Sequence, residues 1–133
     1  MGDRRRSGRV PEFLQVVTTV DSRAAAEKIA RLLVDRRLAA CARVSGPVVS
    51  VYRWKGAVET AREWVCAAKT EKVLYPRVER AIRGVHPYEV PEIVATALAA
   101  GGSDYLEWLS EQVASPVEPR AGARSGRKTK GER

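Results

Sequence analysis

The apolar residues near the start of the chain change from a strand pattern to a helix pattern. Residues 13–20, FLQVVTTV, are mostly apolar and rich in β-branched side chains, which predicts a buried strand. Asp21 and Ser22 follow, and from Ala24 to Arg37 the apolar residues recur at helical spacing. Because serine is a favoured N-cap residue, we expect this strand to lead directly into an amphipathic helix.

Two long β-rich segments come next. Residues 39–54 are interrupted by Gly46-Pro47, where we expect a bulge or bend. Lys55-Gly56 suits a turn, and residues 57–71 return as a second strand. Each arm then has roughly 14 residues and a length of about 45 Å, whereas strands commonly have about five or six residues. The pattern therefore predicts a hairpin that extends beyond a small domain.

A hairpin of this length cannot be covered by one small domain. We expect its overhang to expose unpaired backbone and apolar side chains, which favours pairing with another chain. The apolar side chains concerned are Val49, Val51, Trp64 and Val65. The pattern alone thus predicts a closed, symmetric oligomer built by strand pairing.

A second helix and a fourth strand follow the hairpin. Pro76 suits the first turn of a helix, whose apolar residues continue at helical spacing until Gly84 and Pro87 stop it. Residues 92–99 have the apolar character of a further strand. This part of the chain therefore repeats the helix-then-strand order of its beginning.

The segment 103–113 predicts a short closing helix. Asp104 and Glu107 have the spacing of a capping box at its start. The complete order is then βαββαβ followed by one helix, which is the ferredoxin-like arrangement of the α+β class. Right-handed crossovers would place both main helices on one face of the sheet.

Length and composition indicate one soluble domain. The chain has 133 residues, of which 44% are hydrophobic and 30% charged, and we expect a single core over residues 12–113. Neither a membrane-spanning apolar run nor a signal-peptide pattern is found, so we expect a cytoplasmic protein without membrane contact. Two cysteines in that compartment are expected to stay reduced.

The net charge of +8 belongs mainly to the ends of the chain. Residues 1–11 carry +3 and residues 114–133 carry +4, whereas residues 12–113 hold 14 basic and 13 acidic side chains. Because the end segments have almost no large apolar residues, we interpret them as basic disordered tails. Weak, salt-dependent contact with nucleic acid through these tails is one interpretation, and a merely solubilising extension is the other.

Five short motifs resemble one known family. They are LAACARV at 38–44, SVYRWKG at 50–56, Lys69-Thr70, HPYEVPEI at 86–93 and DYLEWL at 104–109. Their order and spacing over about 100 residues resemble the CutA family, the divalent-cation tolerance proteins. The resemblance implies a ferredoxin-like subunit, a homotrimer joined through the long hairpin strands, residence in the bacterial cytoplasm, and association with copper and other divalent metals.

Two departures from the family pattern concern copper. Some family members have a second histidine immediately before the HPY motif, where this chain has Val85, and a cysteine near the end of the first strand, where it has Val17. Both departures remove good copper ligands. For this chain the resemblance therefore implies weak binding of copper(II) or another divalent cation.

His86 is the leading candidate for contact with a metal. It is the only histidine, and Pro87 and Pro91 make the segment around it stiff. A neutral imidazole suits copper or zinc, and Glu89 or Glu92 can add oxygen ligands. One histidine cannot form a strong site within one chain, although copies in a trimer can combine. The alternatives are a hydrogen-bonded structural histidine at a subunit boundary and a proton-transfer role.

Cys41 and Cys66 are further candidate metal ligands. They lie on opposite arms of the predicted hairpin, at positions that a turn near residues 54–56 would bring close together. A thiolate pair would suit Cu(I) or zinc. The alternative is that each cysteine packs as a small buried hydrophobic residue, which is the commoner role inside an apolar strand.

Several aromatic residues and a lysine are candidates for a subunit boundary or a pocket. A small-molecule pocket edged by aromatic rings is one interpretation, and interface or core packing is the other. Lys69 lies in a mostly apolar strand, where its charge needs a carboxylate such as Glu63, Glu89 or Glu92, and we expect an intersubunit pair. The intersubunit or pocket candidates are Tyr52, Trp54, Lys69, Tyr88 and Trp108.

Common catalytic motifs are absent from the sequence, which contains no P-loop, GxGxxG, GxSxG or HExxH pattern. This absence, together with the resemblance to the CutA family, leads us to expect a non-enzymatic, homotrimeric protein of divalent-metal tolerance. The alternative is a trimeric small-molecule sensor or signalling protein with ligand clefts between subunits, which rests on analogy at the level of the fold.

Overall fold

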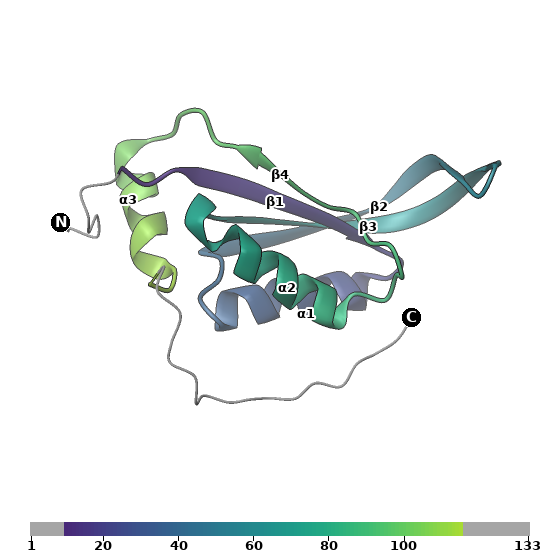
Figure 1. The fold of residues 1–133 in the computed structure, drawn as a ribbon, viewed down its shortest axis with the longest axis horizontal. Helices are drawn as coiled ribbons and strands as arrows, with labels where there is room; N and C mark the ends of the chain where they lie inside the picture. Colours follow the sequence, from purple (N-terminus) through teal and green to yellow (C-terminus); the bar gives the residue numbers. More distant parts are fainter. Residues whose placement is uncertain (1–9, 116–133) are drawn as a thin grey trace.

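The computed structural model describes residues 10–115, whose helices and strands follow the expected order (Figure 1). The strands are β1 (Phe13–Val20), β2 (Cys41–Trp54), β3 (Ala57–Glu71) and β4 (Ile93–Ala97). The helices are α1 (Arg23–Asp35), α2 (Tyr75–Val85) and α3 (Ser103–Gln112), and a 3₁₀ turn, η2 (Lys72–Leu74), precedes α2. The predicted end segments 1–11 and 114–133 lie outside the described residues except at their inner ends.

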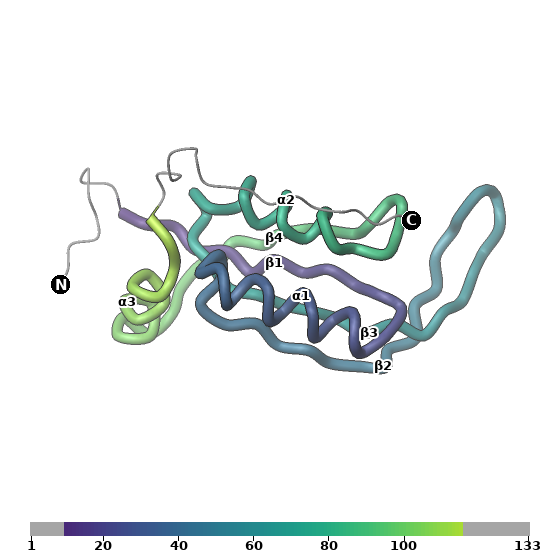
Figure 2. Tube along the Cα trace, turned by 90° about the horizontal axis from the view of Figure 1, so that it is seen from below, coloured from purple at the N-terminus to yellow at the C-terminus, as the bar shows by residue number. Residues whose placement is uncertain are grey.

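The four strands form one antiparallel sheet in the order β2-β3-β1-β4. β1 pairs with β3 from Phe13 opposite Glu71 to Val20 opposite Trp64, and with β4 on its other edge. Figures 1 and 2 show α1 and α2 side by side on one face of this sheet. The expected ferredoxin-like α+β fold is therefore confirmed.

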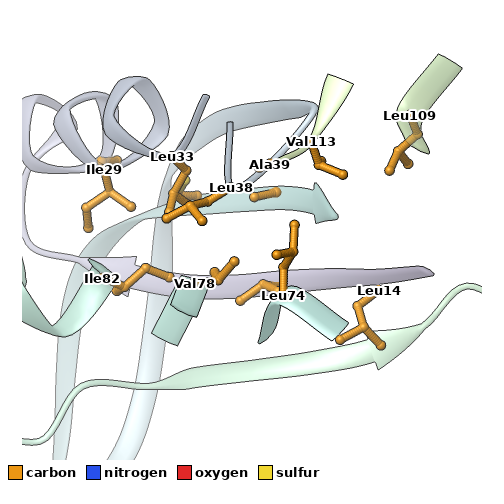
Figure 3. Close-up of a cluster of buried hydrophobic side chains, with 14 of the residues drawn as sticks. Leu14, Ile29, Leu33, Leu38, Ala39, Leu74, Val78, Ile82, Leu109 and Val113 are labelled. Carbon is orange, nitrogen blue, oxygen red and sulfur yellow. The ribbon is translucent and has the colours of Figure 1, made fainter. Parts of the chain in front are cut away.

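The core lies between the sheet and the two main helices. Along β1 every second side chain is buried, from Leu14 to Val20, because alternate residues of a strand point to opposite faces. The helices contribute residues spaced three or four apart, such as Ile29 and Leu33 of α1. Figure 3 shows these side chains in one cluster with others, labelled Leu14, Leu38, Ala39, Leu74, Val78, Ile82, Leu109 and Val113.

The hairpin of β2 and β3 extends beyond the rest of the sheet (Figure 1). Lys55 and Gly56 form its turn with positive φ angles of 52° and 84°. The expected irregularity is confirmed as a register shift between Ser45 and Val48. Gly46 has φ 146° there, and a Cβ on it would lie 2.7 Å from Cδ1 of Trp64. Glycine is therefore required where the strand passes over this ring.

The hairpin exposes only part of the apolar surface expected from the sequence. Val49 and Val51 are 71% and 65% exposed. Trp64 and Val65 are instead partly buried, because β1 reaches far enough along β3 to pair with both of them. The overhang is therefore the part of the hairpin between Trp64 and the turn, where residues 57–63 of β3 have no β1 partner.

The sequence predicted the beginning of α1 correctly, but not the cap of α3 or the role of Gly84 in ending α2. Ser22 caps α1, since its hydroxyl accepts a hydrogen bond from the Ala25 N–H at 3.1 Å. The capping box of α3 is wrong: the N-cap is Gly102, and Asp104 lies inside the first turn, where its carboxylate accepts from the Tyr105 N–H. Gly84 does not stop α2, which continues to Val85.

None of the helices in residues 10–115 has both the length and the apolar character needed to cross a membrane.

Candidate functional site

His86 lies at the end of α2 and is almost completely buried, with 8% of its surface exposed. Its Nε2 lies 2.9 Å from Oγ1 of Thr18 and 3.0 Å from the carbonyl oxygen of Thr19. Its Nδ1 accepts a hydrogen bond from the Tyr88 N–H at 3.1 Å. Because Nδ1 accepts, the proton of a neutral ring is on Nε2, which donates to the end of β1.

Burial keeps the His86 ring neutral by lowering the pKa of the imidazole below its ordinary value. The Thr19 carbonyl and the charges of Asp21 and Glu63 oppose this shift without cancelling it. A neutral imidazole has one lone pair available for a metal, and here the Tyr88 N–H occupies it. Within one chain His86 therefore fastens the segment after α2 to β1.

A second buried contact continues from the same segment. The Tyr88 hydroxyl donates to Oε2 of Glu63 at 2.7 Å, and Glu63 is only 8% exposed. Burial and the Glu63 carboxylate raise the pKa of Tyr88, so the phenol stays protonated. The rings of His86 and Tyr88 meet edge to face at 5.0 Å. Together these residues connect the α2–β4 segment to both β1 and β3.

Sequence reasoning did not find the contact between Tyr88 and Glu63. The sequence suggests Glu63 only as a carboxylate that could pair with Lys69. A signal was present, because a carboxylate directly before an apolar strand segment needs a donor when it is buried. Which donor it finds depends on the path of the α2–β4 segment, and sequence periodicity does not describe that path.

The other two candidate ligands of this segment do not converge on His86. Glu89 and Glu92 are both exposed, and Oε1 of Glu92 accepts a hydrogen bond from the Thr19 hydroxyl at 3.4 Å. Across residues 10–115, no three His, Cys, Asp or Glu side chains are grouped so as to hold a metal ion.

The predicted proximity of the two cysteines is wrong. Cys41 pairs with Lys69, whereas Cys66 pairs with Val44, so the cysteines are three residues out of register. Because neighbouring positions alternate between faces, an odd offset places the two thiols on opposite faces of the sheet. They do not form a thiolate pair within one chain.

The environments of the two thiols differ accordingly. Cys66 is buried against the helices, and this burial raises the pKa of its thiol to about 11. It therefore packs as a small apolar residue, as one of the two sequence interpretations expected. Cys41 is partly exposed, and its Sγ lies 3.5 Å from the hydroxyl of Tyr105 on α3.

The candidate pocket residues are dispersed over one chain. Tyr52 and Trp54 are exposed on the hairpin overhang, whereas Trp108 lies on α3, at the opposite end of the molecule in Figure 1. Lys69 is partly exposed on β3 and forms no ion pair with any other described residue. One chain therefore assembles neither the predicted aromatic pocket nor the predicted lysine pair, and both remain predictions about a subunit boundary.

Residues 14–112 match the model of a protein family described as CutA1 divalent ion tolerance protein. This range includes every helix and strand of the fold except the first residue of β1. The sequence motifs and the observed fold therefore point to the same family.

Individual relatives agree with the family model. The divalent-cation tolerance protein CutA of Thermus thermophilus is 42% identical over 72% of this chain and 93% of its own length. Protein CutA of Mus musculus is 37% identical over 79% of this chain, which spans 60% of that relative.

Solved structures show the same agreement in three dimensions. The Cut A1 structure from Thermus thermophilus has a TM-score of 0.75 at 39% identity and covers 77% of this chain and 99% of its own. The CutA1 structure from a psychrotrophic Shewanella has a TM-score of 0.76 at 34% identity, over 80% of this chain and 100% of its own. This chain therefore belongs to the CutA family of divalent-cation tolerance proteins.

Proposed function

We propose that this protein acts in divalent-cation tolerance as a cytoplasmic, non-enzymatic homotrimer that binds copper(II) or another divalent cation weakly. Membership of the family supports the role in tolerance. The exposed half of the long hairpin is the single observation that carries association between copies, and the number of three copies comes from the family resemblance. The absence of a metal cluster within the described part of one chain supports weak binding.

The hairpin overhang has an unpaired edge and an apolar face. β1 pairs only with residues 64–71 of β3, so residues 57–63 have β2 as their one neighbour in the described chain. Val49, Val51 and Val58 lie on the same face of the overhang, and each is more than 60% exposed. Bare strand edges beside apolar side chains favour association, and closed symmetry prevents that association from continuing into fibres.

The proposed cation contact lies on the exposed carboxylates of the α2–β4 segment. Glu89 and Glu92 are both exposed, and carboxylate oxygens bind divalent cations. His86 would hold the segment in place through Thr18, Thr19 and the Tyr88 N–H rather than bind the metal. Copies of the segment from neighbouring chains would supply the ligands that one chain lacks.

The mass of the particle in solution tests the trimer. Light scattering should give about three times the chain mass of 14.6 kDa. Val51→Glu places a charge on the apolar face of the overhang and should shift the mass toward one chain. Val73→Glu is the matched control, because Val73 is 56% exposed but lies outside the hairpin. A single-chain mass for the unmodified protein would contradict the proposal.

Calorimetric titration of the full chain with copper(II) tests the cation contact. We expect saturable binding that the pair Glu89→Gln and Glu92→Gln weakens at least about tenfold, or about 1.4 kcal/mol. The control pair, Glu107→Gln and Glu111→Gln, removes the same charge from exposed positions on α3. Equal weakening by both pairs would show that net charge, and not this segment, governs the affinity.

A further inference from the structure

The two main helices form a basic pocket that the proposed function does not use. An open surface pocket of about 300 Å³ is lined by Arg36, Arg77 and Arg80, with Leu38 and Ala81 as its apolar lining. None of the described residues that line it carries a carboxylate. A volume of this size is at the lower end of the range for small-molecule sites.

The topology brings the three arginines together from two separate helices. Figure 2 shows that α1 and α2 run in opposite directions, so the end of α1 and the beginning of α2 lie at the same end of the molecule. Arg36 is the C-cap residue of α1, whereas Arg77 and Arg80 lie in the first two turns of α2. Residues three apart share one face of a helix, so both α2 side chains extend on the side of the pocket.

The three pocket arginines have no carboxylate one helical turn away in the sequence. Two other arginines of α1 and α2 pair with a glutamate one turn away: Arg23 with Glu27 at 3.2 Å, and Arg83 with Glu79 at 3.1 Å. The positions four residues before and after the three pocket arginines hold no carboxylate. Those positions are occupied by Leu32, Ala40, Val73, Ala81, Pro76 and Gly84.

The beginning of α2 adds to the same positive field. Its first turn contains no acidic residue and no side chain caps it. The first turn of α2 therefore supplies no negative charge of its own against the partial positive charge of the helix N-terminus. Arg77 also donates to the Ser115 carbonyl at 3.0 Å, and both α2 arginines make further contacts within the chain. An arriving anion would exchange some of these contacts for its own.

We propose that the pocket formed by Arg36, Arg77 and Arg80 binds an oligophosphate, an anion with two or more linked phosphate groups. Guanidinium groups recognise phosphate oxygens through paired hydrogen bonds, and three of them carry three positive charges, which an anion with several negative charges neutralises better than a single carboxylate does. The end of α1 and the beginning of α2, which carry the lining residues, lie on the same side of the molecule as α3 and away from the hairpin overhang (Figure 2). Trimer formation through that hairpin would leave the pocket accessible.

Calorimetric titration of the full chain with inorganic tripolyphosphate tests the pocket. An ionic strength of about 0.15 M shortens the Debye length to about 8 Å and reduces the contribution of basic residues elsewhere. We expect Arg80→Gln to weaken binding at least tenfold and Arg31→Gln to change it less than twofold. Arg31 is a matched control because it is exposed on α1 but does not line the pocket.

Melting controls, a second variant and two further anions distinguish loss of the site from other causes of weaker binding. Both variants should melt within a few degrees of the unmodified protein without ligand, and Arg36→Gln should reproduce the loss seen with Arg80→Gln from the other helix. ATP distinguishes the source: tighter binding than tripolyphosphate identifies a nucleotide, and equal binding identifies the phosphate chain alone. Either ranking upholds the site. Equal affinity in all variants, or citrate binding as tightly as tripolyphosphate, would overturn it.

Discussion

At the scale of single residues, the contacts of His86 explain why one buried imidazole matters. The ring donates toward Thr18 and Thr19 on β1 and accepts from the Tyr88 N–H. Both nitrogens are therefore used within the chain. A protonated ring would turn Nδ1 from an acceptor into a donor facing another donor, so protonation and folding oppose each other.

We predict that the free energy of unfolding decreases as the pH is lowered, because of His86. Its pKa in the folded chain is below the ordinary value of 6.5, so the unfolded chain takes up this proton first. The stabilisation is complete above about pH 6.5 and is lost as pH falls toward the folded-state pKa. Because the chain has one histidine, one imidazole NMR signal reports its titration. A midpoint at or above 6.5 would contradict the prediction.

A second prediction concerns the buried carboxylate of Glu63. Tyr88→Phe removes the hydroxyl that donates to it and should lower the free energy of unfolding by about 1–3 kcal/mol, the cost of an unsatisfied buried group. Tyr105→Phe is the control, because the Tyr105 hydroxyl contacts Cys41 at an exposed position and its loss should cost less than about 0.5 kcal/mol. Urea denaturation at equal protein concentration measures both. Equal losses would refute the distinction.

The candidate site could be predicted only in part at this scale. The sequence identifies His86 as a residue of interest because it is unique and lies between rigid prolines. Its role depends on which main-chain N–H reaches Nδ1, and that is set by the path of residues 86–88. The same limit applies to Glu63, whose partner comes from 25 residues further along the chain.

At the scale of elements, the bulge at Gly46 determines how the hairpin continues past Trp64. The register of β2 and β3 shifts between Ser45 and Val48, directly at this glycine. Its φ of 146° is unfavourable for residues with a Cβ, and the Trp64 ring occupies the space that a Cβ would need. The backbone of Gly46 and the ring of Trp64 therefore form one packing unit.

Two glycine substitutions should have opposite effects. Gly46→Ala should destabilise the protein by more than about 1 kcal/mol, because the added methyl group meets Trp64 and the backbone is strained. Gly84→Ala should stabilise it by about 0.5–1 kcal/mol, since Gly84 lies within α2 with open space around its Cα. Denaturation midpoints check both. Stabilisation by Gly46→Ala would disprove the packing argument.

Element types and the Ser22 cap of α1 were predictable from the sequence, whereas the pairing of the cysteines and the cap of α3 were not. The alternation of residues 13–20 and the helical spacing after Ala24 are strong periodic signals, and both elements are confirmed. The cysteine pairing depends on counting residues across a bulge, where an error of one residue changes the face. Asp104 suits the first turn of a helix as well as its cap, so spacing alone did not distinguish them.

At the scale of the whole molecule, the net charge and the exposed apolar side chains of the hairpin lie in different parts of the chain. The residues from 12 to 113 are nearly neutral, whereas most of the net charge belongs to the ends of the chain. Three of the exposed valines, Val49, Val51 and Val58, instead lie together on the hairpin overhang. Mutual repulsion between the domains themselves is therefore small, which favours association through the hairpin.

The proposed assembly predicts that stability depends on concentration. If copies cover the overhang, the melting temperature of the unmodified protein should rise by several degrees over about a hundredfold increase in protein concentration. Val51→Glu should remove this dependence, and Val73→Glu should retain it. Differential scanning calorimetry measures the effect. A melting temperature independent of concentration in the unmodified protein would contradict coupling between folding and assembly.

The position of β1 inside the sheet also affects the order in which the protein can be completed during synthesis. β1 emerges first from the ribosome, but its neighbours are residues 64–71 on one side and 93–97 on the other. The β2–β3 hairpin joins strands that follow each other directly and can close earlier. A nascent chain that ends before residue 93 leaves β1 with one bare edge, so the sheet is finished only when translation of the domain is nearly over.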